Sequence, residues 1–313
     1  MFVTTDTLLK KAQEENFAVG AFNVNNMEIV QGIVAAAKNL NAPVILQISK
    51  GAREYANPAY LKKLIEAAEQ ESGLPIAMHL DHGPSVEMCK SAVDEGYTSV
   101  MIDGSHEPFE ENIKMTKEIV DYAHSKGVSV EAELGQLIGS QFDAGEEGGK
   151  DGQGIYTDPD EAAEFVERTG CDSLAVAIGS SHGAYKFKGD PRIDLERLKN
   201  IRAKVSIPLV LHAASSVLPE YVEICNKYGA QIEGSKGFPE DKIKESVEIG
   251  IQKVNIDTDL RLAFTGAIRK AFGDTPKEFD PRKYLAPARL AIQEVVERKI
   301  KLLGADQKAS LFL

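Results

Sequence analysis

Short apolar runs recur along the chain, separated by stretches in which apolar residues have helical spacing. Eight runs rich in β-branched and other apolar residues predict strands at residues 17–24, 43–49, 75–81, 99–105, 129–135, 173–180, 208–215 and 253–259. Intervening stretches such as MEIVQGIVAAAKNL and PAYLKKLIEAAEQ have apolar residues three and four positions apart, as in amphipathic helices. Strands and helices that alternate over short loops indicate parallel βαβ units.

The number of these units favours one closed barrel. Eight units in about 250 residues are typical of an α/β protein of the (β/α)₈ TIM-barrel type. An open doubly wound sheet is the alternative, but it usually has fewer strands, and no GxGxxG follows the first strand. After about Leu260 the pattern predicts a helix, the turn KEFDPRKYLAPA and a long amphipathic helix to about Leu303. We therefore predict a single barrel domain over residues 1–313 with extra C-terminal helices, and a mobile loop at the glycine-rich, acidic segment 139–156.

Composition restricts the partners of the protein. The net charge of −12 argues against nucleic acid or an anionic membrane as a partner, because both require a basic surface. The three cysteines, Cys89, Cys171 and Cys225, are widely spaced and odd in number, as expected of free thiols in a reducing cytoplasm. The N-terminus has no signal-type apolar region and no stretch could span a bilayer, so we expect a soluble, cytoplasmic protein that acts on a small molecule.

Candidate chemistry lies at the ends of the predicted strands. The third strand ends in Asp81 and His82, although a buried ionised aspartate costs several kcal/mol unless it is paired or near a metal. His79 and His82 taken alone could be hydrogen-bonded core or turn residues. Other strands place further polar side chains at or just beyond their ends, namely Glu133, His182, His212, Asn255 and Asp257. Catalytic groups of such barrels gather at the C-terminal ends of the strands.

Three histidines and a carboxylate at one rim predict a metal site. Imidazole and carboxylate are the ligands of catalytic Zn²⁺, which keeps one position open for substrate. Of the six histidines, four lie at or just past strand ends, whereas His79 lies inside the third strand and His124 in a helical stretch. Small residues and hydroxyls in GSSHGAYK (179–186), LHAASS (211–216) and the last strand suggest a phosphate pocket, which barrels often build from their last loops.

Several motifs in order resemble the class II (zinc-dependent) fructose-1,6-bisphosphate aldolases over nearly the whole chain. The motifs are HLDHG, MIDGSH, VEAELG, AIGSSHGAYKFK, VLHAAS, KVNIDTDLR and FDPRKYL. The resemblance implies reversible cleavage of fructose 1,6-bisphosphate to dihydroxyacetone phosphate and glyceraldehyde 3-phosphate. It further implies Zn²⁺, or Co²⁺ or another divalent ion, together with a monovalent cation (Na⁺ or K⁺), and a homodimer or larger homo-oligomer.

The resemblance also implies roles for individual residues. The implied metal ligands are His82, His182 and His212, with Glu133 as a further or alternative ligand or a neighbouring group. Asp81 resembles the aspartate that exchanges a proton with the C4 oxygen of the substrate. Asn255 resembles the residue that holds the enediolate, and Asn23 and Ser49 match substrate contacts. The implied phosphate-binding residues are Gly183, Lys186, Ser215, Asp257 and Thr258 at one end of the substrate and Arg261 and Arg282 at the other. Arg282 is expected to reach across the dimer interface.

The sequence departs from the family pattern at two positions. His212 is followed by Ala213 where the family has glycine, and we expect its methyl group to crowd the phosphate or cation pocket and weaken binding. An ungapped count places Gln141 where the family has the glutamate base of its loop. A glutamine amide cannot act as a base near neutral pH, so Glu146 and Glu147 are the candidate replacements.

Three other functions remain open from the sequence. Tagatose-1,6-bisphosphate aldolase shares the fold and the metal site, but its last strand tends to lack the Asp and Arg of NIDTDLR. A degraded, aldolase-like binding protein is supported only by Ala213 and Gln141. A Schiff-base aldolase is opposed by the absence of lysine from the interior of the predicted strands.

Overall fold

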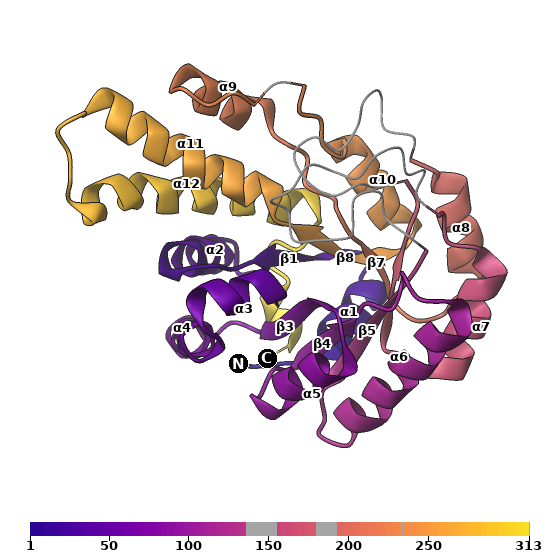
Figure 1. The fold of residues 1–313 in the computed structure, drawn as a ribbon. Coiled ribbons are helices and arrows are strands. Elements are labelled where there is room, and N and C mark those ends of the chain that lie inside the picture. Colours follow the sequence, from indigo (N-terminus) through magenta and orange to yellow (C-terminus); the bar gives the residue numbers. More distant parts are fainter. Residues whose placement is uncertain (136–154, 180–192, 233, 313) are drawn as a thin grey trace.

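The eight strands form a closed parallel barrel in the computed structural model, which describes residues 1–135, 155–179, 193–232 and 234–312 (Figure 1). The strands are β1 (Val19–Asn23), β2 (Val44–Ser49), β3 (Ile76–Gly83), β4 (Ser99–Ile102), β5 (Ser129–Leu134), β6 (Ser173–Val176), β7 (Leu209–Leu211) and β8 (Ile251–Ile256). β1 pairs with β8, with Val19 opposite Lys253, and this pairing closes the barrel. The predicted fold is confirmed, although β4, β6, β7 and β8 each end three or four residues before their predicted boundaries.

Helices surround the barrel and carry the local signals expected of them. They are α1 (Thr5–Glu14), α2 (Met27–Leu40), α3 (Lys50–Ala56), α4 (Pro58–Ser72), α5 (Val86–Asp94), α6 (Phe109–His124), α7 (Pro159–Thr169), α8 (Leu195–Lys204), α9 (Pro219–Lys227), α10 (Glu240–Ile249), α11 (Thr258–Asp274) and α12 (Pro281–Leu302). In α2, for example, the Asn26 side chain accepts a hydrogen bond from the backbone N–H of Ile29, and Asn41 ends the helix in the left-handed conformation.

The first helix closes the N-terminal end of the barrel. Thr5, the first residue of α1, is buried, and its hydroxyl lies 2.7 Å from that of Ser99 and 2.8 Å from that of Ser129. These serines begin β4 and β5. The opposite end, where the strands finish, is therefore the end available for a site.

The last two long helices project from the barrel as an antiparallel hairpin (Figure 1). α12 packs along α11 and against α2. The predicted turn KEFDPRKYLAPA is too long, because α12 begins at Pro281 and contains Pro287. The Asp280 side chain caps this helix by accepting the N–H of Arg282, and proline fits the first helical position because it has no N–H to satisfy there.

The interior of the barrel is polar at positions that a barrel usually fills with branched apolar residues. Lys253 of β8 bonds to His79 of β3 and to Glu131 of β5, and side chains of non-adjacent strands can meet in this way only across the interior. Because strand side chains alternate, Asp81, Glu133 and Asn255, each two residues further on, face the same interior nearer its C-terminal end. The residues between them, Leu80, Ala132 and Val254, belong to the core beneath the helices.

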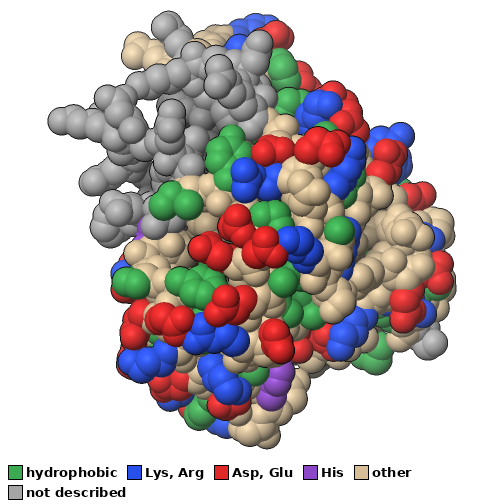
Figure 2. Space-filling view, turned by 90° about the vertical axis from the view of Figure 1, so that its right-hand side faces the viewer, with side chains coloured by type: hydrophobic (Ala, Val, Ile, Leu, Met, Phe, Trp, Pro, Cys, Tyr) green, Lys and Arg blue, Asp and Glu red, His purple; other side chains and the backbone are tan. Residues whose placement is uncertain are grey.

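The surface carries charges of both signs. Figure 2 shows acidic and basic side chains mixed over the helices of one face of the molecule. All three cysteines are buried free thiols. Among the residues described, no helix combines the length and apolar character needed to cross a bilayer.

Candidate active site

Three of the four predicted metal ligands meet at the C-terminal end of the barrel. His82 of β3, Glu133 of β5 and His212, just after β7, each offer one ligand atom, and these atoms all lie within 4.8 Å of one another. The His82 and His212 rings pack edge to face with centroids 4.6 Å apart. The fourth predicted ligand, His182, lies outside the described residues. We refer to His82, Glu133 and His212 as the ligand cluster.

The cluster fits a divalent metal. Glu133 is 1% exposed, and its Oε1 atom has no hydrogen-bond partner among the described residues, although a buried carboxylate oxygen needs one. The other oxygen of Glu133 lies 2.9 Å from His212 Nδ1 and 3.8 Å from His82 Nδ1. Two imidazoles and a carboxylate with an unsatisfied oxygen form a donor set suited to Zn²⁺ or a similar ion.

Both predicted residues at the end of β3 reach the interior because of a bulge. Neighbouring strand residues normally point to opposite faces, so Asp81 and His82 could not otherwise share a site. Between Leu80 and Gly83, β3 has one residue more than β4, and His82 has a φ of 47°. A bulge of this kind redirects a side chain, and such bulges are frequent beside active sites.

Asp103 holds the imidazole of His82. Its Oδ2 atom lies 2.8 Å from His82 Nδ1, and its other oxygen accepts hydrogen bonds from the hydroxyl and N–H of Ser105. Carboxylates next to metal-binding histidines usually fix the ring in this way. Burial lowers the pKa of His82, but the carboxylates of Asp81, Asp103 and Glu133 raise it to about 10. A metal must therefore compete with a proton for this imidazole.

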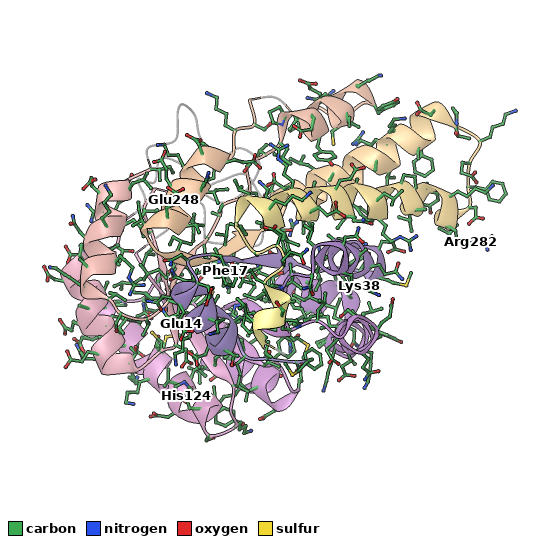
Figure 3. All side chains as sticks on the ribbon, turned by 180° about the vertical axis from the view of Figure 1, so that it is seen from behind. Glu14, Phe17, Lys38, His124, Glu248 and Arg282 are labelled. Atoms are coloured by element: carbon green, nitrogen blue, oxygen red, sulfur yellow. The ribbon has the colours of Figure 1, made fainter. Side chains whose placement is uncertain are left out.

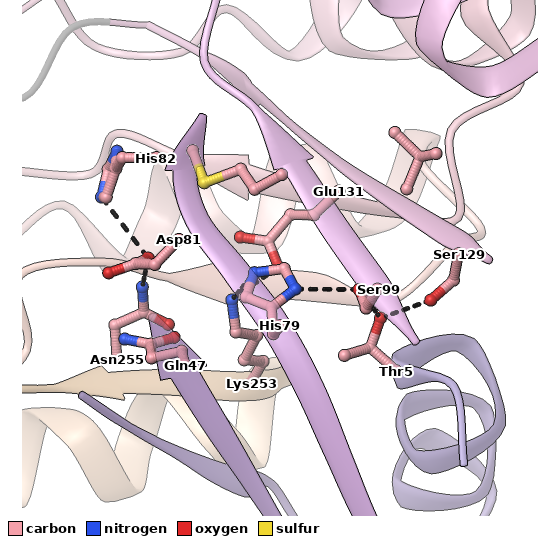
Figure 4. Close-up of polar contacts among 12 residues, drawn as sticks. Thr5, Gln47, His79, Asp81, His82, Ser99, Ser129, Glu131, Lys253 and Asn255 are labelled. Carbon is pink, nitrogen blue, oxygen red and sulfur yellow. Dashed lines mark hydrogen bonds and ion pairs between the residues drawn. The ribbon is translucent and has the colours of Figure 1, made fainter. Parts of the chain in front are cut away.

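Asp81 lies beside His82 of the ligand cluster, and two amides donate to its carboxylate; Figure 4 shows its contacts with His82 and Asn255. Asn23 donates to its Oδ2 at 2.8 Å and Asn255 donates to its Oδ1 at 3.0 Å. The distance from Oδ1 to His82 Nε2 is 3.9 Å. Burial raises the pKa of Asp81, but the neighbouring charges of His82 and Lys253 lower it by more, so the pKa lies below its ordinary value. Asp81 is therefore ionised near neutral pH.

Two further predicted residues line the same rim. Ser49, at the end of β2, lies opposite Asp81 in the strand register and caps α3 through the N–H of Ala52. Asn255 has an Oδ1 atom without a hydrogen-bond partner among the described residues. Gln47, which the sequence did not suggest, donates to Asn23 at 2.6 Å and so fixes that amide.

The predicted phosphate residues of the last strand lie against the loop that follows β7. The backbone N–H of Asp257 donates to the Ser215 hydroxyl at 3.1 Å, and Thr258 begins α11. Arg261, one turn into α11, pairs with the Asp257 carboxylate at 2.8 Å. The structure thus brings Ser215, Asp257, Thr258 and Arg261 together. Gly183 and Lys186 lie outside the described residues.

Asp259 fixes the loop that carries Ser215. This fully buried carboxylate accepts the backbone N–H groups of Ser216 at 2.8 Å and Val217 at 2.7 Å. Lys299 of α12, also fully buried, lies 3.0 Å from it. The loop after β7 is thereby connected to the C-terminal helix.

Ala213 has an unfavourable backbone conformation that the sequence did not predict. It has a φ of 54°, in the left-handed region that favours glycine. Such a backbone costs about 1–3 kcal/mol for a residue with a side chain. The departure from glycine therefore has a conformational cost at this position, in addition to any crowding by the methyl group.

Among the predicted site residues that the structure describes, Arg282 is the one that does not lie at the rim. It lies at the outer end of the α11–α12 hairpin, away from the barrel (Figure 3), and its side chain is 89% exposed. Its guanidinium binds Asp280 at 2.8 Å. A role in catalysis would require a second chain. Gln141, Glu146 and Glu147 lie outside the described residues.

The statement that no lysine lies in a strand interior is wrong. The pattern placed Lys253 at the start of the last strand, but β8 begins at Ile251, and the lysine is fully buried inside the barrel. β8 has an extra residue relative to β7 between Ile251 and Lys253. The Lys253 ammonium bonds to Glu131 at 2.6 Å, and an ammonium held in an ion pair is not a nucleophile.

Comparison with known proteins gives one consistent result. A family model described as "Fructose-bisphosphate aldolase class-II" matches residues 3–308. The chain is 50% identical over 309 residues to a fructose-bisphosphate aldolase of Thermus caldophilus, covering 99% of this chain and 100% of the relative. It is 50% identical over 305 residues to one of Giardia intestinalis, covering 96% and 93%. A crystal structure of the YdjI aldolase from Escherichia coli K12 superposes with a TM-score of 0.78 at 35% identity, covering 99% of this chain and all of the other.

Proposed function

The chain belongs to the class II fructose-bisphosphate aldolases, and from this premise we propose how its own residues carry out the reaction. The protein is a lyase that reversibly cleaves fructose 1,6-bisphosphate to dihydroxyacetone phosphate and glyceraldehyde 3-phosphate. The observation that carries the proposal is the ligand cluster with the ionised Asp81 directly beside it.

We propose Asp81 as the group that moves the proton of the C4 hydroxyl. Cleavage between C3 and C4 requires that this hydroxyl lose its proton, and condensation requires that the proton return. Asp81 is ionised and held by two amides, so it can accept the proton without leaving its position. A divalent cation in the ligand cluster supplies a Lewis acid for the negative charge that develops on the ketose fragment. Asn255, whose carbonyl oxygen accepts no hydrogen bond from the described part of the chain, is proposed to orient that fragment.

Zn²⁺ is the proposed ion, with Co²⁺ as the closest substitute. The family is generally metal-dependent, and imidazole with carboxylate suits both ions. His182 is proposed as the remaining ligand. A monovalent cation, Na⁺ or K⁺, is proposed to lie with the substrate phosphate, near Ser215 and the loop after β7.

The proposed phosphate contacts divide between the two ends of the substrate. Asn23 and Ser49 are proposed to contact the sugar chain. At the dihydroxyacetone phosphate end the proposed residues are Gly183, Lys186, Ser215, Asp257 and Thr258. Arg261 and Arg282 are proposed at the other phosphate. The hydroxyl and backbone groups of the first set suit a phosphate that lies next to a helix start, since α11 begins at Thr258.

Arg282→Ala is expected to raise the KM for fructose 1,6-bisphosphate by about tenfold to a hundredfold, because a hydrogen bond to a charged group contributes about 1.5–3 kcal/mol. Metal content should not change. Lys283→Ala is the matched control, since Lys283 is an exposed cation at the next position and pairs with Glu278. Steady-state kinetics of both variants measure the effect, and an unchanged KM in Arg282→Ala would exclude Arg282 from the site.

A mixed dimer tests whether Arg282 acts in the partner subunit. We propose a homodimer, because the exposed hairpin end cannot reach the rim of its own chain in the described structure. Subunits with Arg282→Ala mixed with subunits with Asp81→Ala should regain part of the activity, since one site per dimer then has both residues. Mixtures no more active than the sum of their parts would show that Arg282 does not act across an interface.

The base that acts on dihydroxyacetone phosphate is proposed to be Glu146 or Glu147. One of Glu146→Gln and Glu147→Gln should slow hydrogen exchange into dihydroxyacetone phosphate by about a hundredfold or more, as loss of a general base implies. Gln141→Ala should change it little. Exchange measured by NMR in ²H₂O would contradict this proposal if only Gln141→Ala reduced the rate.

Parallel assays test the substrate. Triose phosphate release from fructose 1,6-bisphosphate and tagatose 1,6-bisphosphate is measured before and after metal removal by a chelator, and after Zn²⁺ or Co²⁺ is restored. We expect a strong preference for the fructose substrate and activity that depends on the metal. Full activity after complete metal removal would refute the metal-dependent mechanism.

We further propose that the protein acts in the cytoplasm, in glycolysis and gluconeogenesis. The substrate and the three free thiols support this proposal.

A further inference from the structure

Lys253, Glu131 and His79 form a fully buried polar group in the barrel interior (Figure 4), two residues before Asn255, Glu133 and Asp81 on their strands. Lys253 Nζ lies 2.6 Å from Glu131 Oε2 and 3.1 Å from His79 Nε2, and none of the three side chains is exposed. Apolar residues could fill this part of a barrel without the cost of removing two charges from water. The proposed reaction uses none of these residues, so they require another explanation.

The lower end of this group leads to the floor of the barrel. An ammonium can only donate, so His79 Nε2 accepts from Lys253 and His79 Nδ1 donates to the Ser99 hydroxyl at 2.8 Å. Burial and the charge of Lys253 lower the pKa of His79 to about 3, so this imidazole is neutral. Ser99 then meets Thr5 of α1. The position of Lys253 is fixed from below by this series of hydrogen bonds.

The upper end of the group meets a member of the ligand cluster. The second oxygen of Glu131 lies 2.7 Å from His212 Nε2, while Nδ1 of the same ring lies 2.9 Å from Glu133. His212 is 1% exposed, and each of its ring nitrogens faces a carboxylate. The Nε2 side faces the interior, where the Lys253 ammonium lies, and a second cation is disfavoured there. A metal must therefore approach His212 from the Nδ1 side, where His82 and Glu133 lie.

We propose that Glu131, held in place by Lys253, is a positioning residue for the metal ligand His212. By accepting the Nε2–H of His212, Glu131 selects the form of the imidazole whose Nδ1 lone pair faces the ligand cluster, and it fixes the plane of the ring. The carboxylate that orients a ligating imidazole typically strengthens metal binding by about tenfold to a hundredfold. This inference rests on the metal site of the proposed function.

The two oxygens of Glu131 have different tasks in this arrangement. Oε1 receives His212 and Oε2 receives Lys253, so neither is available for the metal or the substrate. Glu131 is therefore not a catalytic residue. Lys253 is required because a buried carboxylate without a cation would either take up a proton or turn away from His212.

Co²⁺ binding by the whole protein tests the proposal. Glu131→Gln is expected to weaken Co²⁺ binding by about tenfold to a hundredfold in competition with a chelator, and to change the visible absorption of the bound ion. Ser129→Ala is the matched control, because Ser129 is buried on the same strand two residues earlier and does not contact His212. It is expected to lower the melting temperature of the metal-free protein without changing Co²⁺ affinity or absorption.

The double variant Glu131→Gln/Lys253→Met separates positioning from stability. It leaves no unpaired buried charge, so its melting temperature should recover relative to Glu131→Gln alone. Its Co²⁺ affinity should stay low, because the carboxylate is still missing. Recovery of both properties would show that the pair serves stability alone and would overturn the proposal.

The outcomes for the wild-type protein distinguish the inference from the metal site itself. If the wild-type chain binds no Co²⁺, the ligand cluster is not a metal centre, and both statements fail. If the wild-type chain binds Co²⁺ and Glu131→Gln binds it equally well with the same absorption, only the role of Glu131 fails. One further measurement uses the wild-type protein and so does not depend on the folding of a variant. In the ¹⁵N NMR spectrum of the Zn²⁺ form with labelled histidine, His212 is expected to carry its proton on Nε2. A proton on Nδ1 would overturn the proposal.

Discussion

His212→Ala is expected to remove the metal and the aldolase activity together. The variant loses one imidazole of the ligand cluster and leaves Glu131 and Glu133 without the group that lies between them. Two like charges that lose their shared partner repel each other, so the cluster should open as well as lose a ligand. We expect bound Zn²⁺ measured by atomic absorption to fall below about a tenth of one ion per chain, and kcat to fall by about a thousandfold or more, as when a Lewis acid is lost.

His124→Ala serves as the matched control for His212→Ala. His124 lies at the end of α6, is exposed, and bonds to Asp172 at 2.8 Å. Its removal should leave both metal content and activity within about twofold of wild type, since exposed pairs contribute little. A His212→Ala protein that kept its metal would remove His212 from the ligand set.

Asp81→Ala is expected to leave the metal in place and abolish cleavage. Its carboxylate is beside the ligand cluster and is bound by amides, so its loss removes a proton acceptor and not a ligand. Loss of a general base reduces kcat by about 10² to 10⁴-fold. Bound Zn²⁺ should remain near the wild-type value, and hydrogen exchange into dihydroxyacetone phosphate, which does not involve the C4 hydroxyl, should continue.

The Asp81→Ala protein is therefore expected to catalyse hydrogen exchange into dihydroxyacetone phosphate without cleaving fructose 1,6-bisphosphate. Asp94→Asn is the control, because Asp94 is an exposed aspartate that binds Tyr122 and Lys126 on the outer helices. An Asp81→Ala protein that lost its metal would show that Asp81 is a ligand. Equal loss of exchange and cleavage would show that its role is not confined to the C4 oxygen.

The barrel could be predicted from the sequence because each strand is buried on its outer face by helices. The apolar positions of β2 and β5 repeat at every second residue or in short runs, and the helices between strands show their own period. The ends of the strands were predicted less accurately. β6 and β7 stop at Val176 and Leu211, whereas the apolar composition continues into residues that no longer pair with a neighbouring strand.

Inside the barrel, the site residues that could be predicted from the strand pattern were those at the strand ends. Glu131 and Lys253 were missed because each lies deeper in its strand, although they stand two residues before Glu133 and Asn255. Strand side chains alternate, so a polar residue at that spacing points into the same interior. Asp103 lies within the motif MIDGSH, but its role could not be predicted, because its contact with His82 depends on the bulge in β3. The sequence pattern contained no sign of that bulge.

The ion pair between β5 and β8 also bears on how the protein is made. Glu131 and Lys253 are 122 residues apart, and His79 and Lys253 are 174 apart, so the partners are far apart in the order of synthesis. A nascent chain that ends before Lys253 cannot enclose Glu131 without burying an uncompensated charge, a cost of about 3–5 kcal/mol. The strand that neutralises the interior is also the one that closes the ring with β1. Earlier strands can thus pair as they leave the ribosome, but the sealed interior can form only after β8 has been translated.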